Sequence, residues 1–179
     1  MPASEKMTGK ERQAYILKKL KQAKAPIKGS DFAQVANVSR QVIVQDVSLL
    51  KAKDEPILAT NQGYIYLKEE AEPLEAKRMI AVNHTPDETL QELNMIVDYG
   101  VTVKDVRVEH AIYGDLTATV NVSNRQEVKT FVQNMEESEA SLLSELTDGV
   151  HLHTLEADDE TKIEAACKAL KEAGILVEE

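Results

Sequence analysis

The sequence of 179 residues has a single cysteine, two phenylalanines and no tryptophan. One thiol, Cys167, can form neither an internal disulfide nor a cysteine-based zinc site, which excludes secreted disulfide scaffolds and fits a reducing compartment. Hydrophobic residues make up 42% and charged residues 29%, as is typical of a globular protein. Because aromatic residues are few, the cores must be aliphatic. The length suits one ordinary domain or two small ones.

The chain also has no apolar run of the roughly 20 residues that a membrane-spanning helix needs, and its N-terminus lacks the apolar stretch of a signal peptide. We therefore expect a soluble, cytoplasmic protein. Its seven glycines form no phosphate-binding loop, and neither His-Glu-x-x-His nor Gly-x-Ser-x-Gly occurs. The sequence thus predicts a protein that is not an enzyme.

The net charge of -10 is distributed unevenly along the chain. Residues 1–53 contain 11 Lys and Arg against 4 Asp and Glu, whereas residues 71–179 contain 9 against 23. A basic head on an acidic body is typical of a DNA-binding module joined to a domain with another task. A solvated basic helix face without a partner is the alternative.

Periodicity in the first third predicts three helices and then two short strands. These elements cover 11–23, 31–36, 40–53, 57–60 and 64–67. Ser30 and Ser39 are the expected N-caps of the second and third helices, and Phe32 and Val35 are expected to face inward. Three helices followed by a hairpin indicate a winged helix-turn-helix domain over residues 1–68.

The third helix presents a polar face of the kind that reads the major groove of DNA. Arg40 can bond to guanine, Gln41 and Gln45 can pair with adenine edges or phosphates, and Val44 can contact a thymine methyl. The predicted DNA-binding set is Ser39, Arg40, Gln41, Val44, Gln45 and Ser48. The alternative is the polar surface of a three-helix protein-interaction module.

A charged segment, 69–75, predicts a linker, and the pattern changes after it to alternating strands and helices. The predicted strands cover 79–83, 101–108, 116–122, 150–155 and 175–177, and the helices cover 86–99, 124–132, 141–146 and 159–173. Ser123 is the expected N-cap of the second of these helices. The order predicts an α+β sandwich over 76–179, with helices on one face of a mainly antiparallel sheet.

All four histidines lie in this second half. His151 and His153 are two apart on a predicted strand, so they project from one face and can chelate one ion. His84 lies where a strand gives way to a helix, and Glu92 is about two turns into that helix. Together they would form a site of three histidines and one carboxylate for Zn, Ni, Fe or Mn. Taken singly, each histidine is an ordinary polar residue.

Several blocks of sequence resemble one known family. Residues 38–47, followed by 57–60 and Gly63-Tyr64, are similar to the helix-turn-helix and wing of the niacin-responsive transcriptional repressors. Three further blocks are similar to their three-histidine (3H) domain: His84 with Glu92, residues 110–114, and residues 146–154. The resemblance implies a homodimeric repressor that binds operator DNA with nicotinic acid as corepressor and controls genes of NAD synthesis or niacin uptake.

The resemblance also assigns residues. His84, Glu92, His151 and His153 match the family's ligands for one divalent transition metal per chain. His110 and Tyr113 match its His-x-x-Tyr-Gly motif, in which Ala111 replaces a common proline, and they are the candidate effector-binding pair. The motif leaves open whether His110 contacts metal, effector or only the fold.

Two other functions remain open on the sequence. One is a regulator that senses the metal itself, without an organic effector. The other is a metal-dependent enzyme that acts on a pyridine-type small acid. An enzyme needs a base beside the metal, and Glu109 and His110 are the only candidates, neither in a recognised catalytic pattern.

Overall fold

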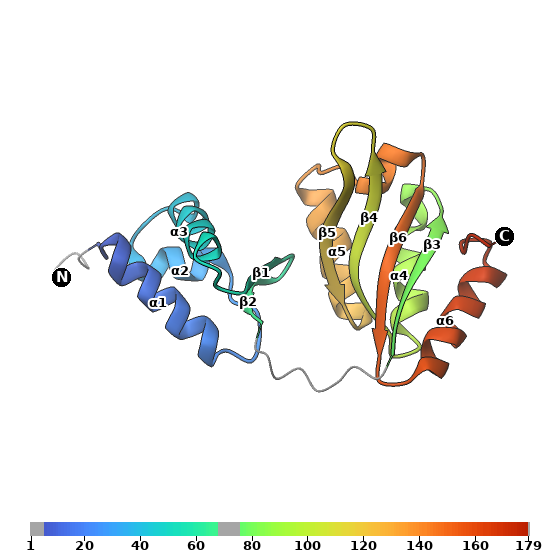
Figure 1. The fold of residues 1–179 in the computed structure, drawn as a ribbon, viewed down its shortest axis with the longest axis horizontal. Helices are drawn as coiled ribbons and strands as arrows, with labels where there is room; N and C mark the ends of the chain where they lie inside the picture. The colour runs from blue at the N-terminus through green and yellow to red at the C-terminus, as the bar shows by residue number, and fades with distance from the viewer. Residues whose placement is uncertain (1–5, 68–75, 179) are drawn as a thin grey trace. The chain divides into compact units, whose positions relative to one another are not determined.

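The computed structural model describes residues 6–67 and 76–178, so the predicted linker at 69–75 lies outside the described residues. Internal contacts divide the chain into two compact units, Met1–Ala71 and Glu72–Glu179 (Figure 1). Each unit has its own core of buried aliphatic side chains. In the part of the chain that is described, no helix is long and apolar enough to cross a membrane.

The first unit has three helices followed by a hairpin, as the periodicity predicts. Its elements are α1 (Gly9–Gln22), α2 (Gly29–Ala36), α3 (Arg40–Ala52), β1 (Ile57–Thr60) and β2 (Gly63–Tyr66). The hairpin strands are antiparallel, and Ile27, between α1 and α2, adds an antiparallel bridge to Tyr64 of β2. The hairpin is therefore held against the helices by backbone hydrogen bonds.

The core of this unit confirms the predicted stripe on α3, because Ile43, Val47 and Leu50 are all buried. A buried ion pair also joins Arg12 of α1 to Asp46 of α3. Arg12 Nη2 lies 3.2 Å from Asp46 Oδ1. The ion pair fixes α1 against the inner face of α3, which leaves the opposite face of α3 exposed.

Two details of the α2 prediction are wrong. The helix begins at Gly29 rather than after Ser30, because the carbonyl of Lys28 accepts the amides of Asp31 and Phe32. Val35 is 52% exposed, whereas Phe32 is buried. The short helix buries one narrow face against α3, and Val35 lies outside that face.

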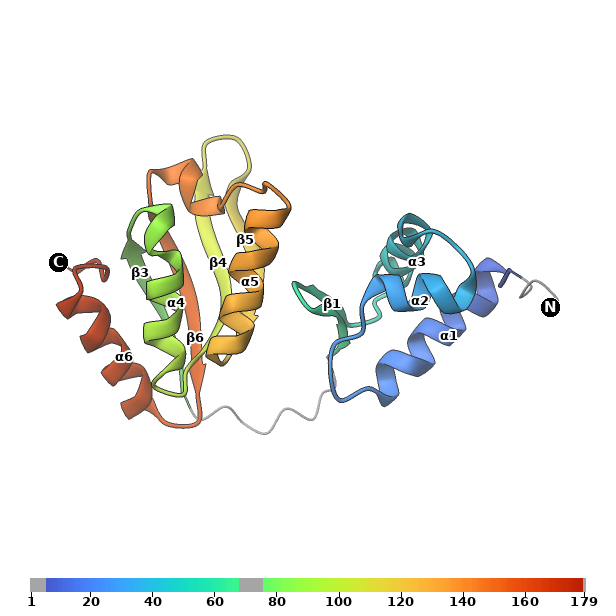
Figure 2. The ribbon, with the colours of Figure 1, turned by 180° about the vertical axis from the view of Figure 1, so that it is seen from behind.

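The second unit is a four-stranded antiparallel sheet in the order β3-β6-β4-β5. Its elements are β3 (Ala76–Asn83), the 3-10 turn η1 (Pro86–Glu88), α4 (Thr89–Val97), β4 (Thr102–His110), β5 (Gly114–Val122), α5 (Arg125–Glu137), η2 (Leu143–Thr147), β6 (Val150–Ala157) and α6 (Glu160–Glu172). Helices α4, α5 and α6 all cover one face of the sheet (Figures 1 and 2). The predicted α+β class is thus confirmed.

Two predicted features of this unit are wrong. The last strand, 175–177, is only an isolated bridge between Leu176 and Val82. Helix α5 is capped by Asn124, whose side chain accepts the amide of Glu127, and not by Ser123. Ser123 instead donates its own amide to the Glu127 carboxylate, so the two neighbours share the capping of this helix.

Candidate metal centre and recognition helix

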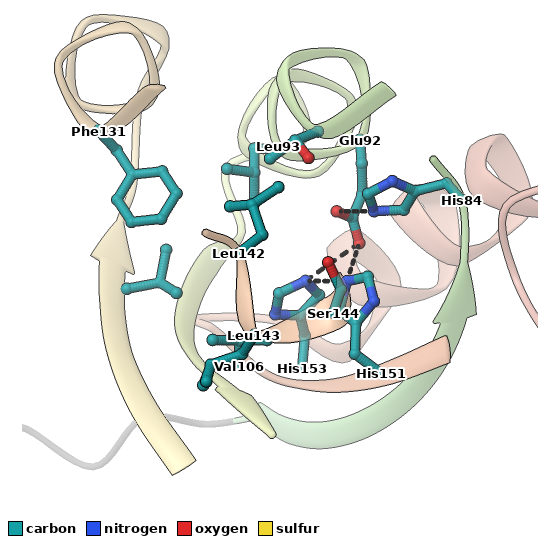
Figure 3. A pocket seen from close by; sticks show the side chains of 12 residues that line it. His84, Glu92, Leu93, Val106, Phe131, Leu142, Leu143, Ser144, His151 and His153 are labelled. Atoms are coloured by element: carbon teal, nitrogen blue, oxygen red, sulfur yellow. Dashed lines mark hydrogen bonds and ion pairs between the residues drawn. The ribbon is translucent and has the colours of Figure 1, made fainter. Parts of the chain in front are cut away.

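Three elements of the second unit bring the predicted ligand residues to one point. His84 follows β3, Glu92 lies in α4, and His151 and His153 project from β6 toward the helices (Figure 3). All four residues are at least 93% buried. The nearness of β3 and β6 follows from their pairing, in which Val82 is opposite His151.

The distances between the facing atoms are short. His84 Nε2 lies 2.6 Å from Glu92 Oε2, and His153 Nε2 lies 3.1 Å from Glu92 Oε1 and 3.1 Å from His151 Nε2. Donor atoms arranged tetrahedrally around an ion at metal–nitrogen distances near 2.05 Å are about 3.3 Å apart. Three of the residues, His84, Glu92 and His151, each place one donor atom within 4.8 Å of the other two, as the ligand shell of a single ion requires, whereas His153 is not part of that set.

Each of the three imidazoles is oriented by a backbone carbonyl. His84 Nδ1 donates to Thr85 O at 2.7 Å, His151 Nδ1 to Gly149 O at 2.8 Å, and His153 Nδ1 to Asp105 O at 2.6 Å. A proton fixed on Nδ1 leaves the lone pair of a neutral ring on Nε2, which is how metal-binding histidines are commonly prepared. The Nε2 atoms are the ones that face Glu92.

The carboxylate at the centre of the cluster is ionised although it is buried. Burial opposes its charge, but the imidazole of His153 and the side-chain contacts of the histidines hold the pKa of Glu92 well below its ordinary value. Burial likewise opposes charge on His84 and His153, while Glu92 raises the pKa of both. Oε1 of Glu92 lies 3.1 Å from His153 Nε2 and 3.6 Å from His151 Nε2, so both carboxylate oxygens face imidazole nitrogens of the cluster.

A small pocket, with a cavity volume of about 30 Å³, opens onto this cluster. Besides the four cluster residues, two hydroxyl side chains line it, those of Thr89 and Ser144. The remaining wall is apolar and consists of Leu93, Val106, Val120, Phe131, Leu142 and Leu143. In Figure 3, Phe131 lies on the opposite side of the pocket from His84, and Leu142 lies between Phe131 and Glu92. The pocket therefore has an ionic end and a hydrophobic end.

The other predicted effector residues are elsewhere. His110 ends β4, and its Nδ1 accepts the amides of Ile112 and Tyr113, so it caps the turn between β4 and β5. Tyr113 is 75% exposed, with its ring 5.1 Å from that of His110. Neither residue lines the pocket, so the structure places this pair at a hairpin tip apart from the histidine–glutamate cluster.

The outer face of α3 carries the predicted DNA-binding residues. Ser39 caps the helix by accepting the amide of Val42, and Arg40, Gln41 and Gln45 are exposed. Ser48 is also exposed and donates its hydroxyl to Val44 O at 2.9 Å. Five of the six predicted residues are thus exposed at the start and middle of one helix, and Val44 is half-buried among them.

In comparisons with known proteins, each of the two units matches a family model. The model of an HTH domain matches residues 12–65, and that of the 3H domain matches residues 77–179. The chain is 54% identical over 175 residues to "Transcription repressor NadR" of Bacillus subtilis, with 97% of each chain covered. It is 39% identical over 174 residues to "Probable transcription repressor NiaR" of Thermotoga maritima, covering 97% of this chain and 98% of that protein. The chain belongs to the NadR/NiaR family of transcription repressors.

Membership of the NadR/NiaR family confirms the predicted function at its general level. The protein is a transcriptional repressor with an N-terminal DNA-binding domain and a C-terminal 3H domain. Its NadR and NiaR relatives are named as repressors, in agreement with the prediction of a regulator rather than an enzyme.

The sequence reasoning missed the residues that shape the pocket. Phe131 lies on the inner face of α5, and the sequence predicts it only as part of the apolar stripe of that helix. Leu142 caps the 3-10 turn η2, which begins with Leu143 and Ser144, and these three residues belong to no motif. Thr89 alone carried a usable signal, because it is three residues before Glu92 and so shares its helix face.

Proposed function

We propose that this repressor uses one divalent transition metal and nicotinic acid to control its affinity for operator DNA, and that it regulates genes of NAD biosynthesis or niacin uptake. The observation that carries the proposal is the pocket, which joins a cluster of three histidines and one glutamate to an apolar wall. A flat aromatic acid likewise has one charged part and one apolar part. Its carboxylate suits the ionic end and its ring suits the hydrophobic end.

The metal would be held by His84, Glu92, His151 and His153 and would be Zn, Ni, Fe or Mn. The donor set supports this assignment, since imidazole nitrogens with one carboxylate suit such borderline ions and the oxygens of the buried Glu92 face these nitrogens. When bound, the ion supplies positive charge that attracts an anionic ligand. The protein's own part is to hold the three Nε2 atoms in place and keep water from the apolar wall.

The effector contacts in this proposal come from the pocket. Phe131 and Leu142 would pack on the pyridine ring, which buries apolar surface. The described lining contains no lysine or arginine, so the centre itself is the proposed partner of the carboxylate. The assignment of His110 and Tyr113 to the effector stays a prediction.

DNA would be read by the exposed face of α3, with Arg40, Gln41, Val44 and Gln45 toward base edges and Ser39 and Ser48 beside them. One helix reads too few base pairs for useful selectivity. A homodimer with two such helices would bind an inverted repeat with half-sites about one helical turn apart. Effector binding would favour the dimer geometry that fits both half-sites.

The test is a four-way comparison of DNA affinity. An operator is first selected from random DNA with the metal-loaded protein and nicotinate, and its affinity is measured with and without metal and nicotinate. We expect nicotinate to tighten binding about 5- to 150-fold, and only with metal present. Nicotinamide, which lacks the charge, is expected to have a much weaker effect.

Other results would support the alternatives. If metal alone gives the full increase in affinity, the protein is a metal sensor without an organic effector. If nicotinate is chemically consumed, the domain is an enzyme. Either result overturns the corepressor proposal.

A further inference from the structure

Thr89 carries a buried hydroxyl that the metal centre does not use. The residue is only 9% exposed, and its Oγ1 has no hydrogen-bond partner. It lines the pocket beside the histidine–glutamate cluster, three residues before Glu92 on α4. Buried polar groups nearly always have a partner, so an exception inside a pocket points to a ligand.

The local backbone explains why this hydroxyl is left over. A threonine near the start of a helix ordinarily bonds to a carbonyl three or four residues earlier. Thr85 O already accepts His84 Nδ1 at 2.7 Å and the amide of Glu88 at 3.0 Å, which uses both of its lone pairs. The carbonyl of Pro86 accepts the amide of Thr89 itself. In the structure the hydroxyl bonds to neither of these carbonyls, which leaves its proton available to the pocket.

The rest of the lining offers few other donors. Apart from the four cluster residues, the only polar side chains among the described lining residues are Thr89 and Ser144. A ligand whose anionic end lies at the cluster has its other end among leucine, valine and phenylalanine side chains. A polar atom on the ring of such a ligand can be satisfied by one of these two hydroxyls.

We propose that Thr89 Oγ1 donates a hydrogen bond to the ring nitrogen of a pyridine carboxylate, which makes Thr89 the residue that distinguishes such an acid from a benzene carboxylate. This inference rests on the proposed function, in which the carboxylate lies at the metal centre. Thr89 is one helical turn before Glu92 on the same face of α4 and lines the same pocket, so its hydroxyl is within the space that a ring extending from the centre would enter.

The hydroxyl favours the pyridine ligand for a simple reason. Nicotinate and benzoate have nearly the same shape and charge, but nicotinate has a nitrogen acceptor where benzoate has a C–H group. A buried nitrogen without a donor loses its hydrogen bond to water and gains nothing in return. Benzoate in turn leaves the threonine hydroxyl unpaired, as it already is in the free protein.

The experiment measures nicotinate, isonicotinate and benzoate by calorimetry with the full metal-loaded chain. We expect the native protein to prefer nicotinate over benzoate by about 10-fold or more, the range of one buried hydrogen bond. Isonicotinate, with its nitrogen opposite the carboxylate, is expected to bind less well than nicotinate. Thr89→Val keeps the side-chain shape and should weaken nicotinate by about 10-fold while leaving benzoate affinity within about 2-fold.

Two further variants separate chemistry from shape. Thr89→Ser keeps the hydroxyl and should keep the preference for nicotinate. Thr130→Val on α5 removes a hydroxyl that bonds to Gln126 O outside the pocket lining, and it should change neither affinity. Thr89→Val should melt no lower than the native protein, because it replaces an unpaired buried hydroxyl with a methyl group.

The inference is overturned if Thr89→Val keeps the native preference, or if Ser144→Ala abolishes it while Thr89→Val does not. Failure of the proposed function looks different: the native metal-loaded protein then binds no nicotinate at all. Unchanged metal content in Thr89→Val shows that any loss of nicotinate affinity comes from the hydroxyl and not from the centre.

Discussion

Replacing His151 and His153 together with alanine removes two of the three Nε2 atoms that face Glu92. We expect the double variant to lose its bound metal, because His84 and one carboxylate cannot complete the coordination of a transition metal. Glu92→Gln should weaken binding less, since all three imidazoles remain. Elemental analysis of the purified proteins measures the metal per chain.

His110→Ala is the matched control for this experiment, because His110 is an imidazole of the same domain at the hairpin tip. It should keep the native metal content. Full metal occupancy in the double variant would refute the proposed site. Loss of metal from His110→Ala alone would indicate that the metal binds at the hairpin instead.

Gly149 is a second single residue on which the centre depends. It has a φ of 102°, and a Cβ there would lie 2.5 Å from the carbonyl oxygen of His84. Gly149→Ala should cost at least about 1 to 3 kcal/mol of stability from backbone strain alone. It should also weaken metal binding, because Gly149 O orients His151. Thermal unfolding and metal titration measure the two effects.

Gly114→Ala is the control, since Gly114 also has a positive φ but open space around the Cβ position. It should cost backbone strain of about the same kind without a change in metal affinity. Equal metal affinities in the two variants would show that the close approach at Gly149 does not support the centre.

At the scale of the element, α3 presents its DNA-binding face as one unit. Arg40→Ala or Gln45→Ala should weaken operator binding by about 1 to 3 kcal/mol and relax base preference, because each side chain contacts base edges in the proposal. Lys168→Ala, an exposed charge on α6, should leave operator affinity unchanged. Competition binding with variant operators measures both quantities.

An equal loss on every DNA sequence would mean that these side chains contact phosphates instead. If neither substitution affects binding, α3 is not the recognition helix.

The elements were predictable where apolar spacing and an end signal agreed. On α3 the stripe of Ile43, Val47 and Leu50 and the Ser39 cap marked both the buried face and the start of the helix. At Ser30 a local cap signal competed with backbone hydrogen bonds to Lys28 O, and the backbone bonds prevailed. Whether Ser123 or Asn124 caps α5 is decided by contacts in the folded chain, which the capping preference of each residue type does not describe.

The candidate ligands were predictable because each has a chemical type and a spacing, as in His151 and His153 on one strand face. The geometry around them was not. The backbone of β4 has an irregular register between Val103 and Asp105, and that same segment supplies the carbonyl that bonds His153 Nδ1. Such a bulge re-aims a backbone group without a sequence motif of its own.

At the scale of the whole molecule, the proposed coupling must act in both directions. If nicotinate tightens operator binding by some factor, operator DNA must tighten nicotinate binding by the same factor. Calorimetric titration of the metal-loaded protein with nicotinate, alone and with saturating operator, measures this factor directly. A factor of one, that is, the same nicotinate affinity with and without operator, would show that the two sites are not coupled.

The imidazoles of the centre depend on the main chain for their orientation. All three Nδ1 atoms donate to backbone carbonyls, of Thr85, Gly149 and Asp105, and none to a side chain. Every residue type carries a backbone carbonyl, so side-chain substitutions at Thr85 or Asp105 leave these acceptors in place. Apart from Gly149, whose backbone conformation requires glycine, the residues that supply these carbonyls can therefore vary while the imidazoles keep their acceptors.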